Sequence, residues 1–408
     1  MALFSFGLGF YGVSVYVAML QRRHGWSASA VSVPVTVYYV AGALVTAWAG
    51  DLYERFGPRA VVSVGSIAMA GGLAALGLVT QPWQLYAVFS VMAVGWGAMS
   101  GGAINIILAP WFQRRRGLAT SIGFNGATLG GVIVAPTLLP LIGVVGLTRA
   151  LQIAALVFLV VLLALAAPVM RRAPEELGLG PDGDLAPSGR GESSRVGDRQ
   201  WRGEAVRTWR FWSVSAPFAL GLAAQVGVLT HLVALLTPAL GMGGAARAVS
   251  ATTAAALIGR SVTGLVVDRL NRRLVSSATL CIQVVGVALL AWAPSPMVVY
   301  AGCALFGSGV GNLVTLPGLI LAVEWPRQGF SPLVSLVVGI NQFTFAFGPS
   351  LVGVVRDWTG SYGPALGTCI GLQVVAAVLI MLGPGRQSRR GRGVPRCPKS
   401  LAEPSSGA

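Results

Sequence analysis

One permanent cation stands within an apolar stretch of the chain. The segment AALIGRSVTGLVVDRLNRR runs from Ala255 to Arg273, and Arg260 lies in its apolar part with no acidic residue near it in sequence. A guanidinium presents a planar fork of N–H donors that matches the two oxygens of a carboxylate. This residue type therefore favours the binding of an organic anion. A structural arginine held by backbone carbonyls and helix-end dipoles is the alternative.

The elements around Arg260 are those predicted for a membrane protein. The chain is 54% hydrophobic and 10% charged, with a mean hydropathy of +0.73, whereas soluble domains carry about 25% charged residues. A spanning helix needs about 20 mostly apolar residues. Twelve stretches meet this requirement, namely 2–20, 31–49, 60–80, 85–110, 118–140, 147–170, 211–236, 248–267, 274–293, 297–323, 331–354 and 362–382. The first of them begins almost at the first residue, so we expect the natural chain to start further upstream.

The depth of Arg260 makes its charge expensive. It lies eight positions before Asp268, at the end of the eighth predicted span. A helix rises 1.5 Å per residue, so Arg260 is about 12 Å inside a hydrocarbon core about 30 Å thick. A cation at that depth costs several kcal/mol unless it faces a wet cavity or a partner.

The basic residues follow a topological pattern. With twelve spans and both termini inside, 23 of the 29 lysines and arginines lie on the inner side, five lie outside, and Arg260 lies within a span. Basic residues accumulate on the cytoplasmic side of membrane proteins. This orientation predicts a multi-pass protein of the cell (inner or plasma) membrane, with both termini cytoplasmic. The net charge of +16 is thereby explained without nucleic acid.

The chain contains an internal repeat with an offset of 214 residues. GDLYERFGPR at 50–59 returns as GLVVDRLNRR at 264–273, and the stretch from Tyr86 to Trp111 returns from Tyr300 to Trp325. Two related halves with a site at their interface are typical of transporters. We expect an all-α membrane protein of two six-helix bundles, 1–170 and 211–382. A cytoplasmic linker, 171–210, separates them, and a disordered basic tail, 383–408, follows.

The repeated loop suggests a conformational gate. Its acidic residues and arginines lie at helix ends, where they can pair with one another and with helix dipoles. A simple role as topology markers is the alternative. The gate residues that this pattern predicts are Gly50, Glu54, Arg55, Gly57, Arg59, Gly264, Asp268, Arg269 and Arg273.

The loop G-x-x-x-[DE]-R-x-G-x-R resembles the signature of the major facilitator superfamily. Its echo is imperfect, because Asn271 stands where the first copy has Gly57. The stretches HGWSASAVS, WFQRRRGLATSIGFNGATLGG and GPSLVGVVRDWTGSY are similar to the monocarboxylate and oxalate/formate branch. The resemblance implies two bundles that rock about a central site, and it implies that Arg260 binds a substrate carboxylate.

The chain also departs from that branch. Proton-coupled relatives carry an aspartate one turn before the arginine, where this chain has Ala256, and some relatives carry a lysine in span 1 or 11. The only lysine here is Lys399, in the tail. A single cation in the spans favours a monocarboxylate, and the missing aspartate leaves a co-transported proton in doubt.

Further polar residues of the spans complete the predicted substrate site. By the resemblance, spans 1 and 11 line the cavity, which selects Tyr11, Asn341 and Gln342. His231 in span 7 is the remaining core group that titrates near neutral pH, although a lone helical histidine is more often a packing residue. The expected partners are a small organic anion, the lipid bilayer and, as an open question, a proton.

Other functions find little support in the residues. The chain has no Walker loop, no metal-ligand spacing and no G-x-S-x-G elbow, so we expect neither an enzyme nor a cofactor nor a metal. An exporter of drugs or other metabolites on the same fold is the main alternative. A non-transporting membrane sensor is a further one.

Overall fold

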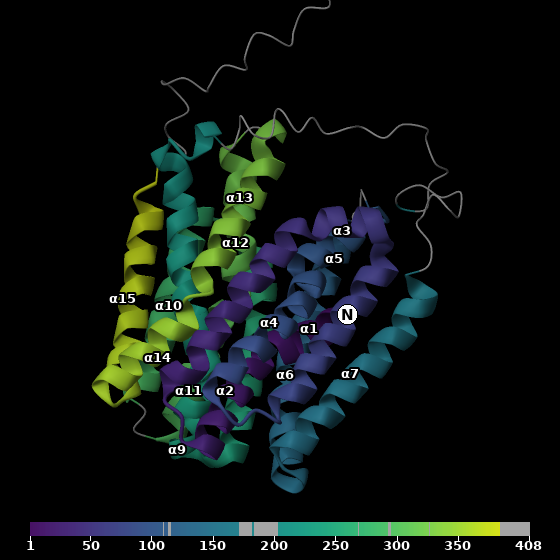
Figure 1. The fold of residues 1–408 in the computed structure, drawn as a ribbon. Helices are drawn as coiled ribbons and strands as arrows, with labels where there is room; N and C mark the ends of the chain where they lie inside the picture. The colour runs from purple at the N-terminus through teal and green to yellow at the C-terminus, as the bar shows by residue number, and fades with distance from the viewer. Residues whose placement is uncertain are drawn as a thin grey trace, which may run out of the picture.

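The computed structural model describes residues 1–108, 110–112, 116–170, 182, 203–267, 269–292, 295–325 and 327–383, and these contain helices and no strand. Most of the predicted linker and nearly all of the predicted tail lie outside the described residues. Figure 1 shows the helices from the first part of the chain, in purple and blue, beside those of the second part, in green and yellow.

The helices follow one another with short turns. The first half contains α1 (Ala2–Phe6), a π-helix η1 (Gly7–Tyr11), α2 (Gly12–His24), α3 (Ala28–Leu76), α4 (Pro82–Met99), α5 (Gly101–Leu108), α6 (Arg116–Val145) and α7 (Leu147–Val169). The second half contains α9 (Trp209–Val266), α10 (Arg272–Trp292), α11 (Pro296–Gly309), α12 (Asn312–Glu324), α13 (Arg327–Phe345), α14 (Gly348–Thr359) and α15 (Tyr362–Met381).

Ten helical segments among the described residues are long and apolar enough to cross a membrane. Two of them, α3 with 49 residues and α9 with 58, are too long for one crossing. Each contains one glycine with non-helical backbone angles, Gly57 in α3 and Gly241 in α9. Counting each long helix as two spans is consistent with the twelve spans that the sequence predicts.

The gap predicted between spans 7 and 8 is wrong in its extent. The sequence analysis leaves residues 237–247 outside the helices, but they are helical except at Gly241, whose φ is +65°. This stretch contains three alanines, one leucine and one methionine, which favour helix, but also three glycines and one proline. Helix propensity alone therefore does not explain it, whereas a helix in a membrane satisfies its backbone groups internally. One glycine with positive φ is enough to redirect the chain.

The first predicted span is interrupted by the π-helix at Gly7–Tyr11. Two hydroxyls, one from α2 and one from α3, donate to its backbone carbonyls. The Tyr16 hydroxyl donates to the Leu8 carbonyl (2.9 Å), and the Tyr38 hydroxyl donates to the Gly9 carbonyl (2.8 Å). Short π segments in helices often lie at functional sites. This one ends at Tyr11, a predicted site residue.

The two halves are hydrogen-bonded to each other toward one end of the molecule. Asp357 of α14 accepts from the backbone N–H groups of Ala28 (3.0 Å) and Ser29 (2.7 Å) at the start of α3. Deeper in, the Ser250 hydroxyl of α9 donates to the Val132 carbonyl of α6 (3.2 Å). Within the described ranges, no hydrogen bond joins the halves at the opposite end, where Gly57 lies.

Candidate functional site

Arg260 lies in α9 at the junction of the two halves. Its side chain is half-buried, and its Nη1 donates to the backbone carbonyl of Phe124 in α6 over 3.5 Å. Its Nε is buried and has no hydrogen-bond partner among the residues that the structure describes. A buried donor without a partner costs about 1–3 kcal/mol, and more when it is charged. The guanidinium therefore retains capacity for an anionic acceptor.

A glycine makes room for this guanidinium. A Cβ atom built on Gly311 would lie 2.6 Å from the Nε and 2.8 Å from the Cζ of Arg260. Real Cβ atoms do not approach other atoms so closely, so the charged plane rests directly on the Gly311 backbone. Gly311 belongs to the repeated Gly-x-Gly pair that the sequence shows in both halves.

The repeat shows how the site differs from its counterpart in the first half. Subtracting the offset of 214 from Arg260 and Gly311 gives Thr46 and Gly97. There, the Thr46 hydroxyl donates to the Gly97 carbonyl (3.2 Å) and contacts the Ser100 hydroxyl (3.1 Å). In the first half this pair of positions is neutral and its hydroxyl is hydrogen-bonded. In the second half the pair carries a positive charge, and some of the guanidinium donors have no partner.

Tyr11 lies near Arg260, and its role in the substrate site stays a prediction. Its ring packs over Gly131 of α6 beside the Thr253 methyl group of α9. Neighbouring rings extend an aromatic wall through the first half: Phe10 lies 5.2 Å from the Tyr11 ring and 6.0 Å from the Trp96 ring, centroid to centroid. The indole Nε1 of Trp96 is buried without a described partner.

Asn341 and Gln342 lie in α13 of the second half. Asn341 is buried, and its side-chain oxygen has no partner within the described part of the chain; Gln342 is half-buried. Near them, Phe345 meets Tyr39 of α3 edge-on at 5.5 Å. No contact among the described residues joins Asn341 or Gln342 to Arg260, so their place in the site stays a prediction.

His231 lies apart from this group. Its Nε2 is 3.1 Å from the Pro349 carbonyl, and its Nδ1 is 3.3 Å from the Tyr362 hydroxyl. Both partners belong to the second half, in α14 and α15, and both ring nitrogens are engaged. The structure does not bring His231 to Arg260, and a role in proton transfer stays a prediction.

The charged side chains of the first copy of the gate motif are exposed on the protein surface. Glu54, Arg55 and Arg59 are exposed, and none of them forms a described ion pair. Gly57 has a φ of +73°, which breaks α3, and Pro58 follows where a helix tolerates proline best. Gly50 lies in the helix before this break.

The second copy is built differently. Asp268 lies outside the described residues, while Gly264 and Arg269 are exposed. Arg273 is buried and makes two hydrogen bonds to the carboxylate of Glu324 in α12, at 2.7 and 2.8 Å. Asn271, which replaces the glycine of the first copy, accepts from the Arg273 backbone N–H (3.0 Å) at the start of α10. Asn271 therefore caps the start of α10, whereas Gly57 at the matching position of the first copy breaks α3.

Sequence reasoning missed the groups that hold Arg260 and Arg273 in place. A backbone acceptor such as the Phe124 carbonyl has no signature in the side-chain sequence. The Gly-x-Gly pair that contains Gly311 recurs at the repeat offset, but its closeness to Arg260 depends on the packing of the helices. Glu324 is the last residue of α12, and its pairing with Arg273 depends on how α10 and α12 pack.

Metal chemistry has no evident site in the described part of the chain. No group of three or more histidines, cysteines, aspartates and glutamates lies there in a position to hold an ion. What the arrangement offers instead is one cation with free donors between two helical halves.

Comparison with known proteins extends this description. The sequence profile of the family described as Major Facilitator Superfamily matches residues 1–328. The crystal structure of the nucleoside transporter NupG is similar in fold, with a TM-score of 0.73 over 93% of this chain and 96% of that one, at 12% sequence identity.

Three relatives are similar in sequence. MFS-type transporter 1 of Ophiocordyceps sp. (strain BCC 1869) is 29% identical over 74% of this chain and 64% of its own length. The oxalate:formate antiporter of Oxalobacter formigenes is 26% identical over 54% of each chain. A putative anionic 4-hydroxy-benzoate permease of Thauera aromatica is 34% identical over 24% of this chain and 60% of its own. The alignment thus spans less than two thirds of each of these three relatives.

Proposed function

Since the chain belongs to the Major Facilitator Superfamily and has its two-half helical membrane fold, we propose that it is a secondary active transporter of a small organic anion, a monocarboxylate. It carries its substrate by alternating access between the halves. We further propose that it lies in the cell membrane with both termini cytoplasmic, and that its bundles are 1–170 and 211–382.

The observation that carries this proposal is the guanidinium of Arg260. It stands within a span, it reaches across the junction to α6, and its buried Nε has no described partner. A carboxylate would supply the missing acceptor and the opposite charge together. Two of the relatives are named as anion transporters, one for oxalate and formate and one for 4-hydroxy-benzoate.

The geometry supports a simple coupling between binding and movement. The contact from Arg260 to the Phe124 carbonyl is long, at 3.5 Å, and a neutral carbonyl is a weaker acceptor than a carboxylate. A bound carboxylate therefore competes with Phe124 for the guanidinium. This hydrogen bond between α9 and α6 is released when substrate binds, which weakens one of the links between the halves.

The surroundings of Arg260 favour an anion with an apolar or aromatic body. Tyr11 lies near the guanidinium, and the Phe10 ring packs edge-on against the Tyr11 ring at 5.2 Å. No second cation is described near the guanidinium, so a dicarboxylate would leave one charge uncompensated.

The test is a comparison of Arg260→Ala and Arg260→Lys with the unaltered protein. Affinity for a panel of monocarboxylates is measured by ligand-induced thermal shift, and flux is measured in proteoliposomes. A charge-assisted hydrogen bond contributes about 1.5–3 kcal/mol, so both variants should bind at least about tenfold more weakly and lose uptake. Lysine keeps the charge but not the fork of donors.

Arg247→Ala is the matched control, because Arg247 is an exposed arginine of the same helix α9. Its affinity and flux should be unchanged. Normal affinity in a stable Arg260→Ala protein would overturn the anion site. If uncharged compounds are transported equally by the unaltered protein and by the Arg260 variants, the exporter alternative is supported. If the protein binds ligands but transports none, a sensor is supported.

A further inference from the structure

A second concentration of cations surrounds a pocket far from Gly57, at the end where the halves are hydrogen-bonded to each other. The pocket has a volume of about 470 Å³ and lies between the last turn of α2 and the turn from α6 to α7. Three arginines line it, Arg22 and Arg23 from α2 and Arg149 from α7, and no acidic residue does. This concentration needs a physical explanation.

The charge pattern of the whole chain makes these three arginines unusual. Only five basic residues are predicted on the outer side, and three of them line this one pocket. A fourth, Arg356, forms an ion pair with Asp357 (3.0 Å). Arg22 and Arg149 are exposed and have no hydrogen bond or ion pair among the described residues. Three like charges repel one another unless an anion lies among them.

The helix that begins at the pocket adds to the positive potential. α7 starts at Leu147, and its N-cap residue, Gly146, provides no side-chain acceptor. The Thr148 hydroxyl does not cap the helix either, since it donates to the Gly77 carbonyl (2.6 Å). The first N–H groups of α7 therefore lack a side-chain partner at the positive end of the helix dipole, which is a favourable place for an anion.

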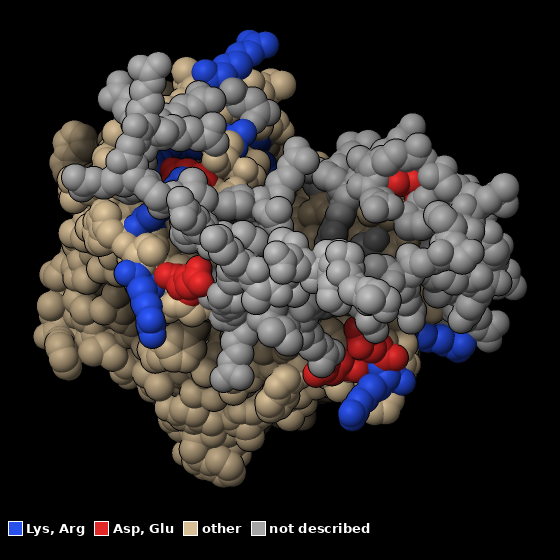
Figure 2. All heavy atoms as spheres, turned by 90° about the horizontal axis from the view of Figure 1, so that it is seen from above, with Lys and Arg blue, Asp and Glu red and all other residues tan. Residues whose placement is uncertain are grey.

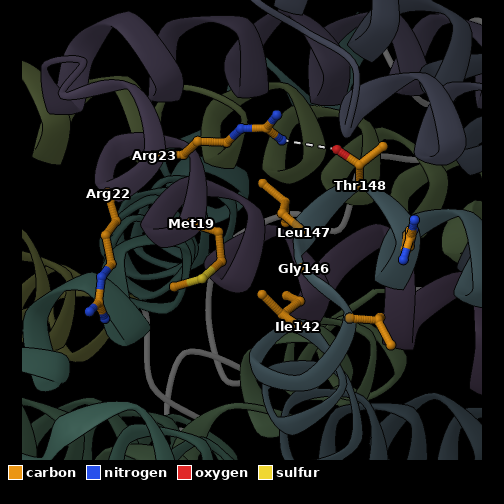
Figure 3. Close-up of a pocket in the computed structure, with 9 residues that line it drawn as sticks. Met19, Arg22, Arg23, Ile142, Gly146, Leu147 and Thr148 are labelled. Atoms are coloured by element: carbon orange, nitrogen blue, oxygen red, sulfur yellow. Dashed lines mark hydrogen bonds between the residues drawn. The ribbon is translucent and has the colours of Figure 1, made fainter.

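Below this charged rim, the pocket is apolar. Met19, Ile142 and Leu147 line it, and each is at least nine-tenths buried. In Figure 3 the Arg23 side chain points toward Thr148, with which it is hydrogen-bonded (3.0 Å), whereas Arg22 points away on the other side of Met19. Arg22 and Arg23 thus lie on different sides of the apolar lining and do not converge on one point.

We propose that this pocket binds the phosphate headgroup of an anionic phospholipid. A spread rim of cations fits a headgroup with several oxygens better than it fits one small ion. The apolar floor at the end of membrane-spanning helices suits the beginning of an acyl chain. Each Lys or Arg near an anionic lipid surface contributes about 1 kcal/mol of attraction. A bound lipid would brace α2 against the α6–α7 turn.

The test uses the purified full-length protein and a double variant, Arg22→Gln/Arg149→Gln. Arg23 is left in place because it bonds the Gly77 carbonyl and Thr148. Lipid binding is measured by native mass spectrometry, with the rise in unfolding temperature as a second readout. Phosphatidylglycerol should bind the unaltered protein, and the double variant should bind it at least about tenfold more weakly. Arg247→Gln, which removes an exposed charge on the same side, should bind it normally.

Two further ligands separate a lipid from a free anion. Phosphatidylcholine, which carries no net charge, and soluble glycerol phosphate, which has the headgroup without the chains, should both bind much more weakly than phosphatidylglycerol. Equal phosphatidylglycerol binding by the double variant would overturn the site. Phosphatidylcholine or glycerol phosphate that binds as tightly as phosphatidylglycerol would overturn its assignment to an anionic lipid.

Discussion

Gly311 determines where the Arg260 guanidinium can lie. A Cβ at this position would come within 2.8 Å of the Cζ of Arg260, so Gly311→Ala must displace the charged plane. The backbone at Gly311 has a φ of −94°, which alanine adopts without strain. We therefore expect Gly311→Ala to fold and to insert normally, but to bind carboxylates at least about tenfold more weakly.

A matched control for this prediction lies seven residues further on. Gly318 is in α12, and a Cβ built there meets no atom within 4 Å. Gly318→Ala should keep its affinity for substrate and raise helix stability by up to about 1 kcal/mol. Isothermal titration of both variants with one monocarboxylate measures the difference. Equal affinities would show that the position of the guanidinium does not matter for binding.

At the residue scale, the sequence predicts the charge of the site but not the groups that hold it. Arg260 was identifiable because a cation in an apolar span is costly. The contacts of its guanidinium with the Gly311 backbone and the Phe124 carbonyl could not be predicted, since both arise from the packing of α9 against helices distant in sequence. The buried Trp96 nitrogen and the unpartnered Asn341 oxygen are likewise visible only in three dimensions.

Between elements, the carboxylate of Asp357 links the halves. It accepts from two backbone N–H groups at the start of α3, where the helix dipole favours a negative charge. Asp357→Asn removes the charge and one acceptor. Because a hydrogen bond to a charged group contributes about 1.5–3 kcal/mol, the variant should shift the equilibrium between open and closed arrangements of this end by about tenfold or more toward open.

Distances between spin labels can measure that shift. Cysteines at Val144 and Gly363, both exposed at this end of the two halves, carry the labels in a background without native cysteines. The fraction of long distances should rise in Asp357→Asn and stay unchanged in Thr359→Val, whose hydroxyl bonds only its own helix and the following turn. An unchanged distribution in Asp357→Asn would remove the carboxylate from any role in closure.

Within the second half, Glu324 compensates a buried cation. Arg273 donates to both oxygens of Glu324 and also to the carbonyls of Ser213 and Ile380. Removing one partner of a buried ion pair costs about 3–5 kcal/mol. Glu324→Gln should therefore lower the unfolding temperature clearly, as measured by tryptophan fluorescence on heating. Glu54→Gln, at an exposed carboxylate without a described ion pair, should change it little.

The elements themselves are predicted well where hydropathy governs them and poorly where the chain turns. Each apolar stretch corresponds to a helical segment, because spans must satisfy their backbone groups internally. The turn between spans 7 and 8 is confined to Gly241, the residue of this stretch with non-helical backbone angles. The sequence does not predict the π-helix at Gly7–Tyr11. The hydroxyls that donate to its carbonyls belong to Tyr16 of α2 and Tyr38 of α3, and their positions depend on how the helices pack.

For the whole molecule, the distribution of hydrogen bonds between the halves fits one state of the proposed transport cycle. Hydrogen bonds between the halves run from Asp357 through Ser250 to Arg260, and none is described beyond Arg260 toward Gly57. Arg260 thus stands where the joined part of the interface ends. Alternating access requires the opposite arrangement to exist as well, with the Gly57 end joined. The exposed charges of the first gate motif are available for that second state.

The orientation of the molecule in the membrane is the last prediction. Figure 2 views the end opposite the Asp357 contact, where side chains of both charges gather among the described residues. The sequence assigns 23 basic residues to the inner side and five to the outer, and such a bias sets orientation strongly.

In a background without the four native cysteines, Ser188→Cys in the linker should react with an impermeant maleimide only after the cells are permeabilised. Arg247→Cys, at the other end, should react in intact cells. Because the joined end then faces outward, substrate would reach Arg260 from the cytoplasm in this state. Labelling of Ser188→Cys in intact cells, with Arg247→Cys protected, would reverse the orientation and that direction of access with it.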